Sequence, residues 1–225
     1  MNLAEAGFTQ RHTRWLANAT VFISGTCLMV VELLAGRVIS RFVGQSLYTW
    51  TAIIGVVLAG ISVGNYAGGI LADRWASRRM LTALFLLAAA GCLSVLALNS
   101  LAGHWAALQA RAWPARILLH VAITFLLPAL LLGTIGPVAA RMAVAADTRT
   151  GRAVGDVYAW GSVGAIAGTF LAGFVLIPAF GVTAIICGAS GILASMGCFF
   201  WVAVALRRDG EQKPARGAVV PPGAQ

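Results

Sequence analysis

The chain has 225 residues, of which 60% are hydrophobic and only 10% are charged. Soluble domains carry about a quarter of charged residues, so this composition excludes an ordinary soluble domain. The net charge of +9 could indicate nucleic acid, but the basic residues gather in short segments between long apolar runs. That distribution is typical of membrane proteins whose basic loops meet anionic headgroups. We therefore expect a lipid bilayer, and no nucleic acid, as a partner.

A helix that crosses a bilayer needs about 20 mostly apolar residues. By this measure the chain divides into an N-terminal segment (1–15), a transmembrane domain (16–206) and a basic tail (207–225), which is expected to be disordered. Six spans are predicted, at 16–39, 48–72, 80–101, 115–143, 155–178 and 182–206. The predicted fold class is thus an all-α integral membrane protein with six transmembrane helices. The fourth span contains two prolines and is expected to bend.

Lysine and arginine are unevenly distributed between the two sides of these spans. If both termini are cytoplasmic, twelve of the 16 basic residues lie inside, and only Arg37, Arg41, Arg111 and Arg116 lie outside. This positive-inside bias predicts cytoplasmic termini in a bacterial-type inner membrane. The first span is too long for a cleaved signal peptide and lacks a small-residue cleavage site.

The first span contains one acid, Glu32, in its outer part. An ionised carboxylate in hydrocarbon is costly, so such a residue usually faces a cavity or a partner. A structural ion pair is one interpretation. Because Arg37 and Arg41 lie on other faces of the same helix, its partner would come from another helix. The alternative is a substrate or proton site.

The second span is rich in glycine. Gly60, Gly64 and Gly68 lie four residues apart, so they form a smooth strip that another helix can approach closely. Asn65 and Tyr66 interrupt the inner half of the span. Asparagine often only joins neighbouring helices, and contact with a substrate is the alternative.

A short basic loop follows the second span. It reads Gly69-Ile-Leu-Ala-Asp73-Arg74 and continues to Arg78 and Arg79. An acid at this place can pair with a neighbouring helix end, and the arginines hold the loop at the membrane surface. The pattern resembles the loop between the second and third helices of the major facilitator superfamily, although it lacks that family's second glycine.

His120 lies near the outer end of the fourth span. By the helical rise, His120 and Glu32 are both expected roughly 7–10 Å below the outer surface, so acid and imidazole would share one layer and relay protons. A neutral histidine held by a hydrogen bond is the alternative. In the fifth span Gly164 and Gly168 repeat the glycine strip, and packing alone explains their spacing.

Patterns typical of metal sites or of catalytic residues are weak in this sequence. The four cysteines lie within spans without the spacing of a metal site, and neither a metal nor a cofactor is expected. Gly188-Ala-Ser-Gly191 resembles a segment of rhomboid proteases. In that family the serine precedes the histidine, whereas His120 precedes Ser190 here, so an intramembrane protease is a minor alternative.

Two longer segments resemble one family. They are Glu32-Leu-Leu-Ala-Gly-Arg with Gly44 to Gly60, and Gly155-Asp-Val-Tyr-Ala-Trp with Gly164 to Gly168 and Leu176-Ile-Pro178. Both are similar to the membrane half of fused transporter/spermidine-synthase-like proteins, in which a facilitator-type bundle precedes an aminopropyltransferase domain. The resemblance covers about residues 20–206 and implies a half-facilitator bundle. Gly161-Ser162 stands where the family tends to have Asn-Thr. The synthase domain has no counterpart, so no enzyme activity is implied.

Together, sequence and resemblance predict transport of a small polar or cationic solute, such as a polyamine-like compound. A full facilitator places its site between two six-helix halves, so a homodimer or a pairing with another half-bundle is expected. The two glycine strips would then meet between copies or, alternatively, pack within one bundle. The competing hypothesis is a membrane anchor or delivery subunit for a separate spermidine-synthase-like enzyme.

Overall fold

The computed structural model describes residues 3–145 and 149–211, with side chains described for 13–145 and 149–206. The elements are α1 (Leu3–Val43), α2 (Leu47–Trp75), α3 (Arg78–His104), α4 (Ala106–Gln109), α5 (Trp113–Ala145), α6 (Thr150–Phe170), the π-helical η1 (Leu171–Leu176), α7 (Ile177–Ala179) and α8 (Val182–Glu211). No strand occurs among these residues. The predicted disordered tail began at residue 207, but α8 continues to Glu211, and the rest of that tail lies outside the described residues.

Six helical stretches in the described part are long and apolar enough to cross a membrane. They are Thr13–Val43, Leu47–Trp75, Arg78–His104, Trp113–Ala145, Thr150–Ala179 and Val182–Leu206. Each predicted span falls within one of them, so the all-α class and the six spans are confirmed. Most of the helices extend several residues beyond the predicted limits, and the short α4 was not predicted.

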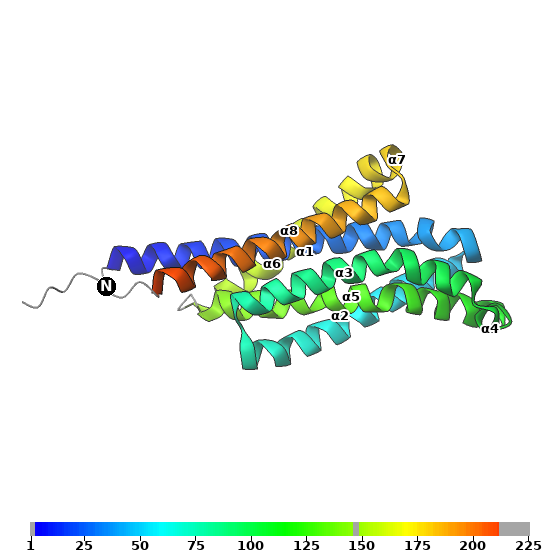
Figure 1. Cartoon of the computed structure of the whole chain (residues 1–225). Helices are drawn as coiled ribbons and strands as arrows, with labels where there is room; N and C mark the ends of the chain where they lie inside the picture. Colours follow the sequence, from blue (N-terminus) through cyan, green and yellow to red (C-terminus); the bar gives the residue numbers. More distant parts are fainter. Residues whose placement is uncertain (1–2, 146–148, 212–225) are drawn as a thin grey trace, which may run out of the picture.

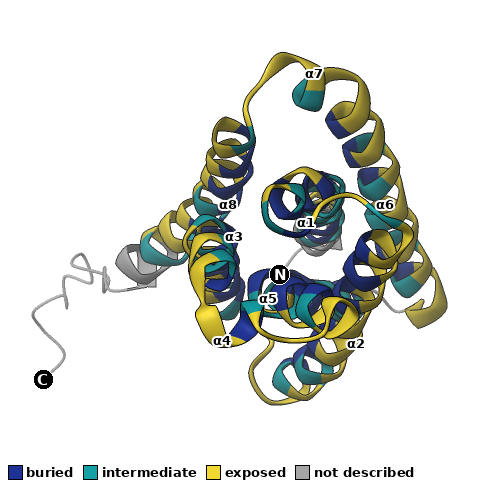
Figure 2. Ribbon diagram, turned by 90° about the vertical axis from the view of Figure 1, so that its right-hand side faces the viewer, coloured by how far each residue is buried: buried dark blue, intermediate teal, exposed yellow. Residues whose placement is uncertain are grey.

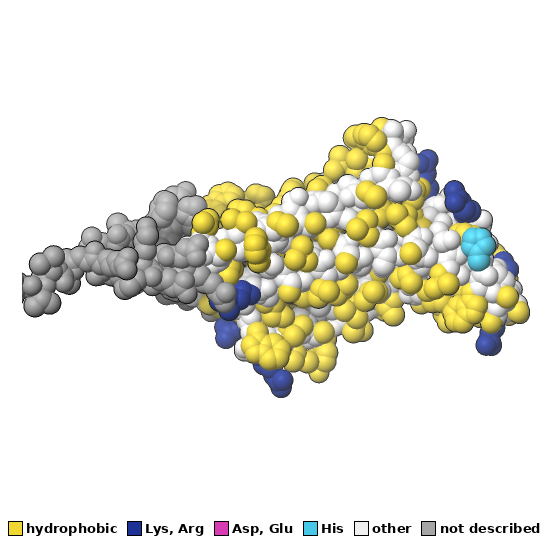
Figure 3. Space-filling model, viewed as in Figure 1, with side chains coloured by type: hydrophobic (Ala, Val, Ile, Leu, Met, Phe, Trp, Pro, Cys, Tyr) yellow, Lys and Arg dark blue, Asp and Glu magenta, His cyan; other side chains and the backbone are white. Residues whose placement is uncertain are grey.

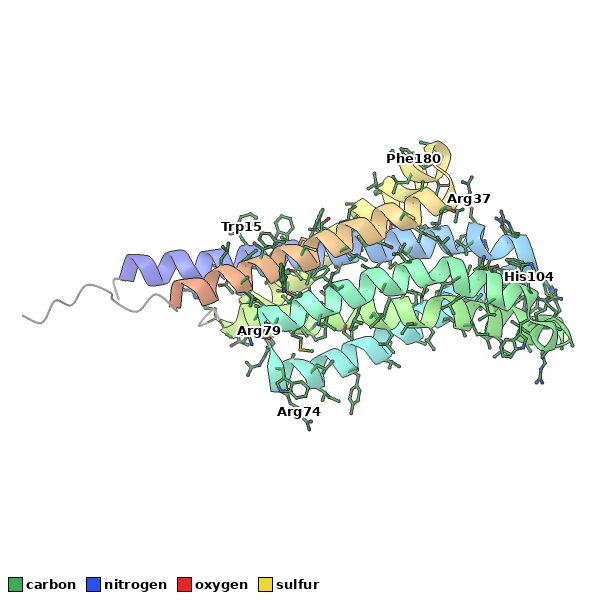
Figure 4. The ribbon with its side chains drawn as sticks, viewed as in Figure 1. Trp15, Arg37, Arg74, Arg79, His104 and Phe180 are labelled. Carbon is green, nitrogen blue, oxygen red and sulfur yellow. The ribbon has the colours of Figure 1, made fainter. Side chains whose placement is uncertain are left out.

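The helices form an elongated bundle (Figure 1). We call the end where α1 begins and α8 ends the terminal end, and the opposite end the distal end. Hydrophobic side chains cover the middle of the molecule, and arginines gather at both ends (Figure 3). Arg74 and Arg79 lie toward the terminal end, whereas Arg37 and His104 lie toward the distal end (Figure 4).

Local chemistry sets two of the turns between spans. Gly44 follows α1 with a φ of 76°, a left-handed conformation that glycine adopts without strain, and its N–H bonds Ser40 O at 3.0 Å. Ser46 then caps α2 by accepting from Thr49 N at 3.2 Å. Ser77 caps α3 in the same way through Met80 N. These caps satisfy N–H groups that have no partner within the helix.

Helix α1 lies in the middle of the bundle, and α3, α5, α6 and α8 surround it (Figure 2). Its side chains Leu34 and Ile39 are buried in a core that includes Phe85 of α3 and Phe125 of α5. Lipid is as apolar as leucine, so close packing rather than expulsion of water holds such a bundle together.

Glycines close the contact between α2 and α5. A Cβ on Gly60 would lie 2.7 Å from Ala129 Cβ, and one on Gly68 would lie 2.6 Å from Thr134 O. At Gly64 it would overlap Leu130 O. The backbones therefore meet at a distance that only glycine permits.

Glycines close the contact between α1 and α6 in the same way. A Cβ on Gly25 would lie 2.7 Å from Gly161 O, and Cβ atoms on Gly164 and Gly168 would overlap the carbonyls of Phe22 and Thr26. Both glycine strips are thus buried within one bundle. The sequence left open whether the strips pack between copies or within one bundle. The structure shows packing within one bundle, so the strips are not free for contact between copies.

The contacts follow a three-plus-three pattern. If α1, α2 and α3 form one unit and α5, α6 and α8 form another, the second helix of each unit packs on the first helix of the other. The two first helices also meet, and so do the two third helices. Nested repeats of three helices are known in the halves of facilitator-type transporters.

The fifth span contains the one π-helical segment of the described chain. Pro178 has no N–H to donate, and the preceding N–H, that of Ile177, bonds Ala172 O five residues back. By contrast, α5 continues as one helix through Pro128 and Pro137. The irregular backbone therefore lies in the fifth span at the distal end.

Candidate functional site

A cavity of about 670 Å³ lies between the α1–α6 pair and the α2–α5 pair, and we call it the central cavity. Its lining comes from α1, α2, α5 and α6, mainly from their terminal halves. Six lining side chains are polar, namely Ser24, Asn65, Asp73, Arg141, Tyr158 and Ser162. The volume falls within the range of small-molecule sites, about 300–1,000 Å³.

Small residues create this space. Within each pair the helices touch through glycine, so the free volume lies between the pairs rather than inside them. Gly25, Gly69, Gly136 and Gly161 also line the cavity and add no side-chain volume to it. Polar groups in the interior of a membrane bundle are costly unless they face water or a ligand.

The cavity continues to the terminal surface. A second pocket of about 710 Å³, the terminal pocket, shares Ala72, Asp73 and Arg141 with it. Arg141 Nε lies 3.9 Å from an Asp73 carboxylate oxygen, and 80% of the Asp73 side chain is exposed. An exposed pair at this distance contributes little to stability, so it separates readily. The two residues stand at the passage between the pockets.

The predicted site on α2 is split by the structure. Asn65 lines the central cavity, as do Gly69 and Asp73 from the predicted loop motif. Tyr66, the next residue along the helix, is 75% exposed and is not part of the lining. Arg74 lines the terminal pocket.

The two other arginines of the loop motif, Arg78 and Arg79, lie apart from the central cavity. Arg78 is half-buried and lines only a small crevice beside α1 and α5, whereas Arg79 is exposed. The loop motif therefore meets the cavity only through its first half.

Glu32 lies one helical turn beyond the central cavity. It follows the lining residue Leu28 by four positions and precedes Gly36, which packs on the Trp50 ring of α2, by four. Residues four apart share a helix face, so Glu32 lies on the face of α1 that lines the cavity. It is half-buried and forms no ion pair or hydrogen bond with any described residue.

His120 belongs to a different cluster, near the distal end. Its Nε2 lies 2.9 Å from Asn99 Oδ1 on α3, and Asn99 Nδ2 donates to Val38 O at 3.2 Å. The imidazole also packs on the Phe42 ring, with centroids 5.5 Å apart. The structure therefore has the alternative to a proton relay, in which His120 is held within the bundle by a hydrogen bond.

The expected layer of Glu32 and His120 is therefore wrong. Phe42, which contacts His120, follows Glu32 by ten residues, roughly 15 Å along the helix. The predicted first span stopped at residue 39, whereas α1 continues to Val43 and leaves Glu32 roughly 16 Å from the end of the helix. His120 is only roughly 10 Å from the start of α5.

Several residues that line the cavity were not predicted from the sequence. Ser162 and Tyr158 lie four residues apart on α6 and line the same cavity as Asn65 of α2. Their spacing was a usable signal, because the same four-residue repeat placed Gly164 and Gly168 on one face. Arg141 gave no such signal, since a single arginine near a helix end has many explanations.

In the described parts of the chain, no group of three or more His, Cys, Asp or Glu side chains could hold a metal ion. Comparisons with protein-family models, with curated proteins and with solved structures give no match for this chain. The functional conclusion therefore depends on the bundle and on its cavity.

Proposed function

We propose that this chain is one half of a membrane transporter that moves a small polar or cationic solute, of polyamine-like chemistry, through the central cavity. The observation that carries the proposal is the cavity itself, which has six polar side chains in a mainly apolar lining and lies among four membrane-spanning helices. A membrane anchor needs only apolar helices. Asn65, Ser162 and Ser24 within such a bundle instead suit a solute with hydrogen-bonding groups.

The charges near the cavity support a cationic solute. Asp73 stands at its terminal mouth, where Arg141 lies 3.9 Å away and offsets part of its charge, and Glu32 lies one turn beyond its inner end. Glu32 has no partner among the described residues and can therefore receive an ammonium group. The Tyr158 ring, 73% exposed in the wall, adds a surface that attracts cations.

A second half-bundle would complete the site. Asn65, Tyr158 and Ser162 are exposed, so the described residues of one chain do not enclose the cavity. The flanking helices α2 and α6 also expose apolar side chains, such as Val63 and Phe170. Another copy of the chain, or a different half-bundle, would cover these faces. Light scattering of the purified protein in mild detergent measures this, and an active monomer would contradict it.

Transport by the purified protein in liposomes tests the proposal. Uptake of labelled di- and polyamines, with and without a pH gradient, should exceed that of protein-free liposomes. Glu32→Gln should abolish uptake while the protein remains folded and inserted. Normal uptake by Glu32→Gln would remove Glu32 from the site. A folded protein that moves no solute would favour the membrane-anchor hypothesis.

A further inference from the structure

A basic pocket lies at the distal end, apart from the central cavity. It has a volume of about 450 Å³ and is formed by the end of α1, the end of α3 and the start of α8. We call it the distal pocket. Its polar lining consists of Arg37, Arg41, Asn99, Ser100, His104 and Thr183. None of these residues lines the central cavity.

The two arginines of the distal pocket lack an acidic partner. Arg37 and Arg41 lie four residues apart, so they are neighbours on one helix, where like charges destabilise each other. Along the chain, the nearest acids are Glu32 before them and Asp73 after them. Among the described residues neither arginine forms an ion pair, and Arg37 donates only to Ile177 O, at 2.8 Å. Arg41 has neither a hydrogen-bond partner nor an ion-pair partner among them, so its guanidinium donors remain available.

The remaining lining offers further donors. Thr183 and Ser100 bring hydroxyl groups from α8 and α3, and His104 Nδ1 bonds Ser100 O at 2.8 Å. Val182 and Thr183, which also line the pocket, are the first residues of α8, where N–H groups have no partner within the helix. Two guanidinium groups, hydroxyls and free N–H groups together match a phosphate, whose oxygens only accept.

The position of the pocket points to lipid as the source of that phosphate. Helices α3 and α8 lie on the outside of the bundle, away from the central cavity, and pack on each other below the pocket. Their large exposed side chains between the two ends are apolar, such as Leu86 and Leu93 on α3 and Ile192 on α8. Arg37 and His104 lie at the distal end, where this apolar surface stops (Figures 3 and 4).

We propose that the distal pocket binds the phosphate of an anionic phospholipid, whose acyl chains lie along α3 and α8. The bound phosphate neutralises Arg37 and Arg41 and links α1 to both outer helices. This site is independent of transport, because it shares no residue with the central cavity.

Native mass spectrometry of the protein in mild detergent with added phosphatidylglycerol tests the lipid site. The wild type should retain bound lipid, and Arg37→Gln with Arg41→Gln together should weaken binding roughly tenfold or more, since two charge-assisted contacts are lost. Arg111→Gln is the matched control, because it removes one positive charge at the same end outside the pocket. Arg41→Lys keeps the charge but not the planar guanidinium group. It should bind lipid more weakly than the wild type and more tightly than the double variant.

Two further results decide the outcome. Arg41→Gln alone removes no described hydrogen bond, so its folding should be intact and its lipid binding still reduced. Equal binding by the wild type, the double variant and Arg111→Gln would overturn the proposal. Displacement of the lipid by millimolar inorganic phosphate would overturn the lipid assignment and identify a site for free phosphate.

Discussion

The α2–α5 and α1–α6 pairs use the same glycine packing but are fixed in different ways. In the α1–α6 pair, Arg14 is paired with Asp156, Thr26 Oγ1 donates to Gly164 O at 2.9 Å, and the Trp15 and Trp160 rings lie 6.0 Å apart. Among the described residues of α2 and α5, the only polar side-chain contact between the helices is the exposed one of Asp73 with Arg141.

This difference assigns a separate role to each pair. The α2–α5 pair relies on close backbone packing along most of its length, because its one ion pair lies in water at the terminal end and its one ring contact, Tyr48 with Trp113 at 5.3 Å between centroids, lies at the distal end. The α1–α6 pair is anchored near its terminal end by polar and aromatic contacts and becomes π-helical toward its distal end. Since the central cavity lies between them, a change in either pair should alter its width. Three substitutions, from the largest expected effect to the smallest, test this comparison.

Gly64→Ala should have the largest effect. Its Cβ would overlap Leu130 O, and backbone cannot move aside as a side chain can, so we expect a loss of about 3 kcal/mol. Gly55→Ala is the control on the same helix, because a Cβ there meets nothing within 4 Å. It should be neutral or slightly stabilising. Thermal unfolding in one detergent measures both, and equal melting temperatures would show that α2 and α5 are not in contact at Gly64.

Asp156→Asn should have an intermediate effect. Its partner Arg14 is 30% exposed and Asp156 is 36% exposed, so solvent screens the pair partly and we expect a loss of about 1 kcal/mol. Asp73→Asn, which removes the acid from the ion pair between α2 and α5, should leave the melting temperature unchanged. If Asp73→Asn destabilises the protein as much as Asp156→Asn, the two pairs are anchored alike and the comparison fails.

Thr26→Val should have the smallest effect. It keeps the side-chain volume but removes the hydroxyl that is shared between Phe22 O of its own helix, at 2.8 Å, and Gly164 O of α6, at 2.9 Å. Interhelical bonds of this kind contribute about 0.6 kcal/mol. The control is Thr169→Val on α6, where the hydroxyl donates only to Ala165 O of its own helix. Chemical unfolding of the two variants side by side resolves the difference. A loss as large for Thr169→Val would mean that the contact with α6 contributes nothing specific.

The sequence predicted what depends on composition and spacing. The six spans follow from apolar length, and the glycine strip at Gly60, Gly64 and Gly68 follows from a four-residue repeat. It could not predict which helix each strip touches, because spacing defines a face but not its neighbour. The predicted depth of Glu32 below the outer end of its helix was also wrong. Gly44, with its positive φ, ends α1 four residues beyond the predicted limit, so Glu32 lies farther from the distal end than expected and does not share a layer with His120.

The central claim is that solute occupies the cavity between the two pairs, and labelling at Ser162 tests it most directly. In a background without the exposed Cys187 and Cys198, Ser162→Cys places a thiol in the cavity wall, and Val163→Cys places one beside it on the outer face. A bulky thiol reagent should block amine uptake only through Ser162→Cys, and excess amine should slow that labelling. Equal inhibition through both positions, or no protection by amine, would contradict the claim.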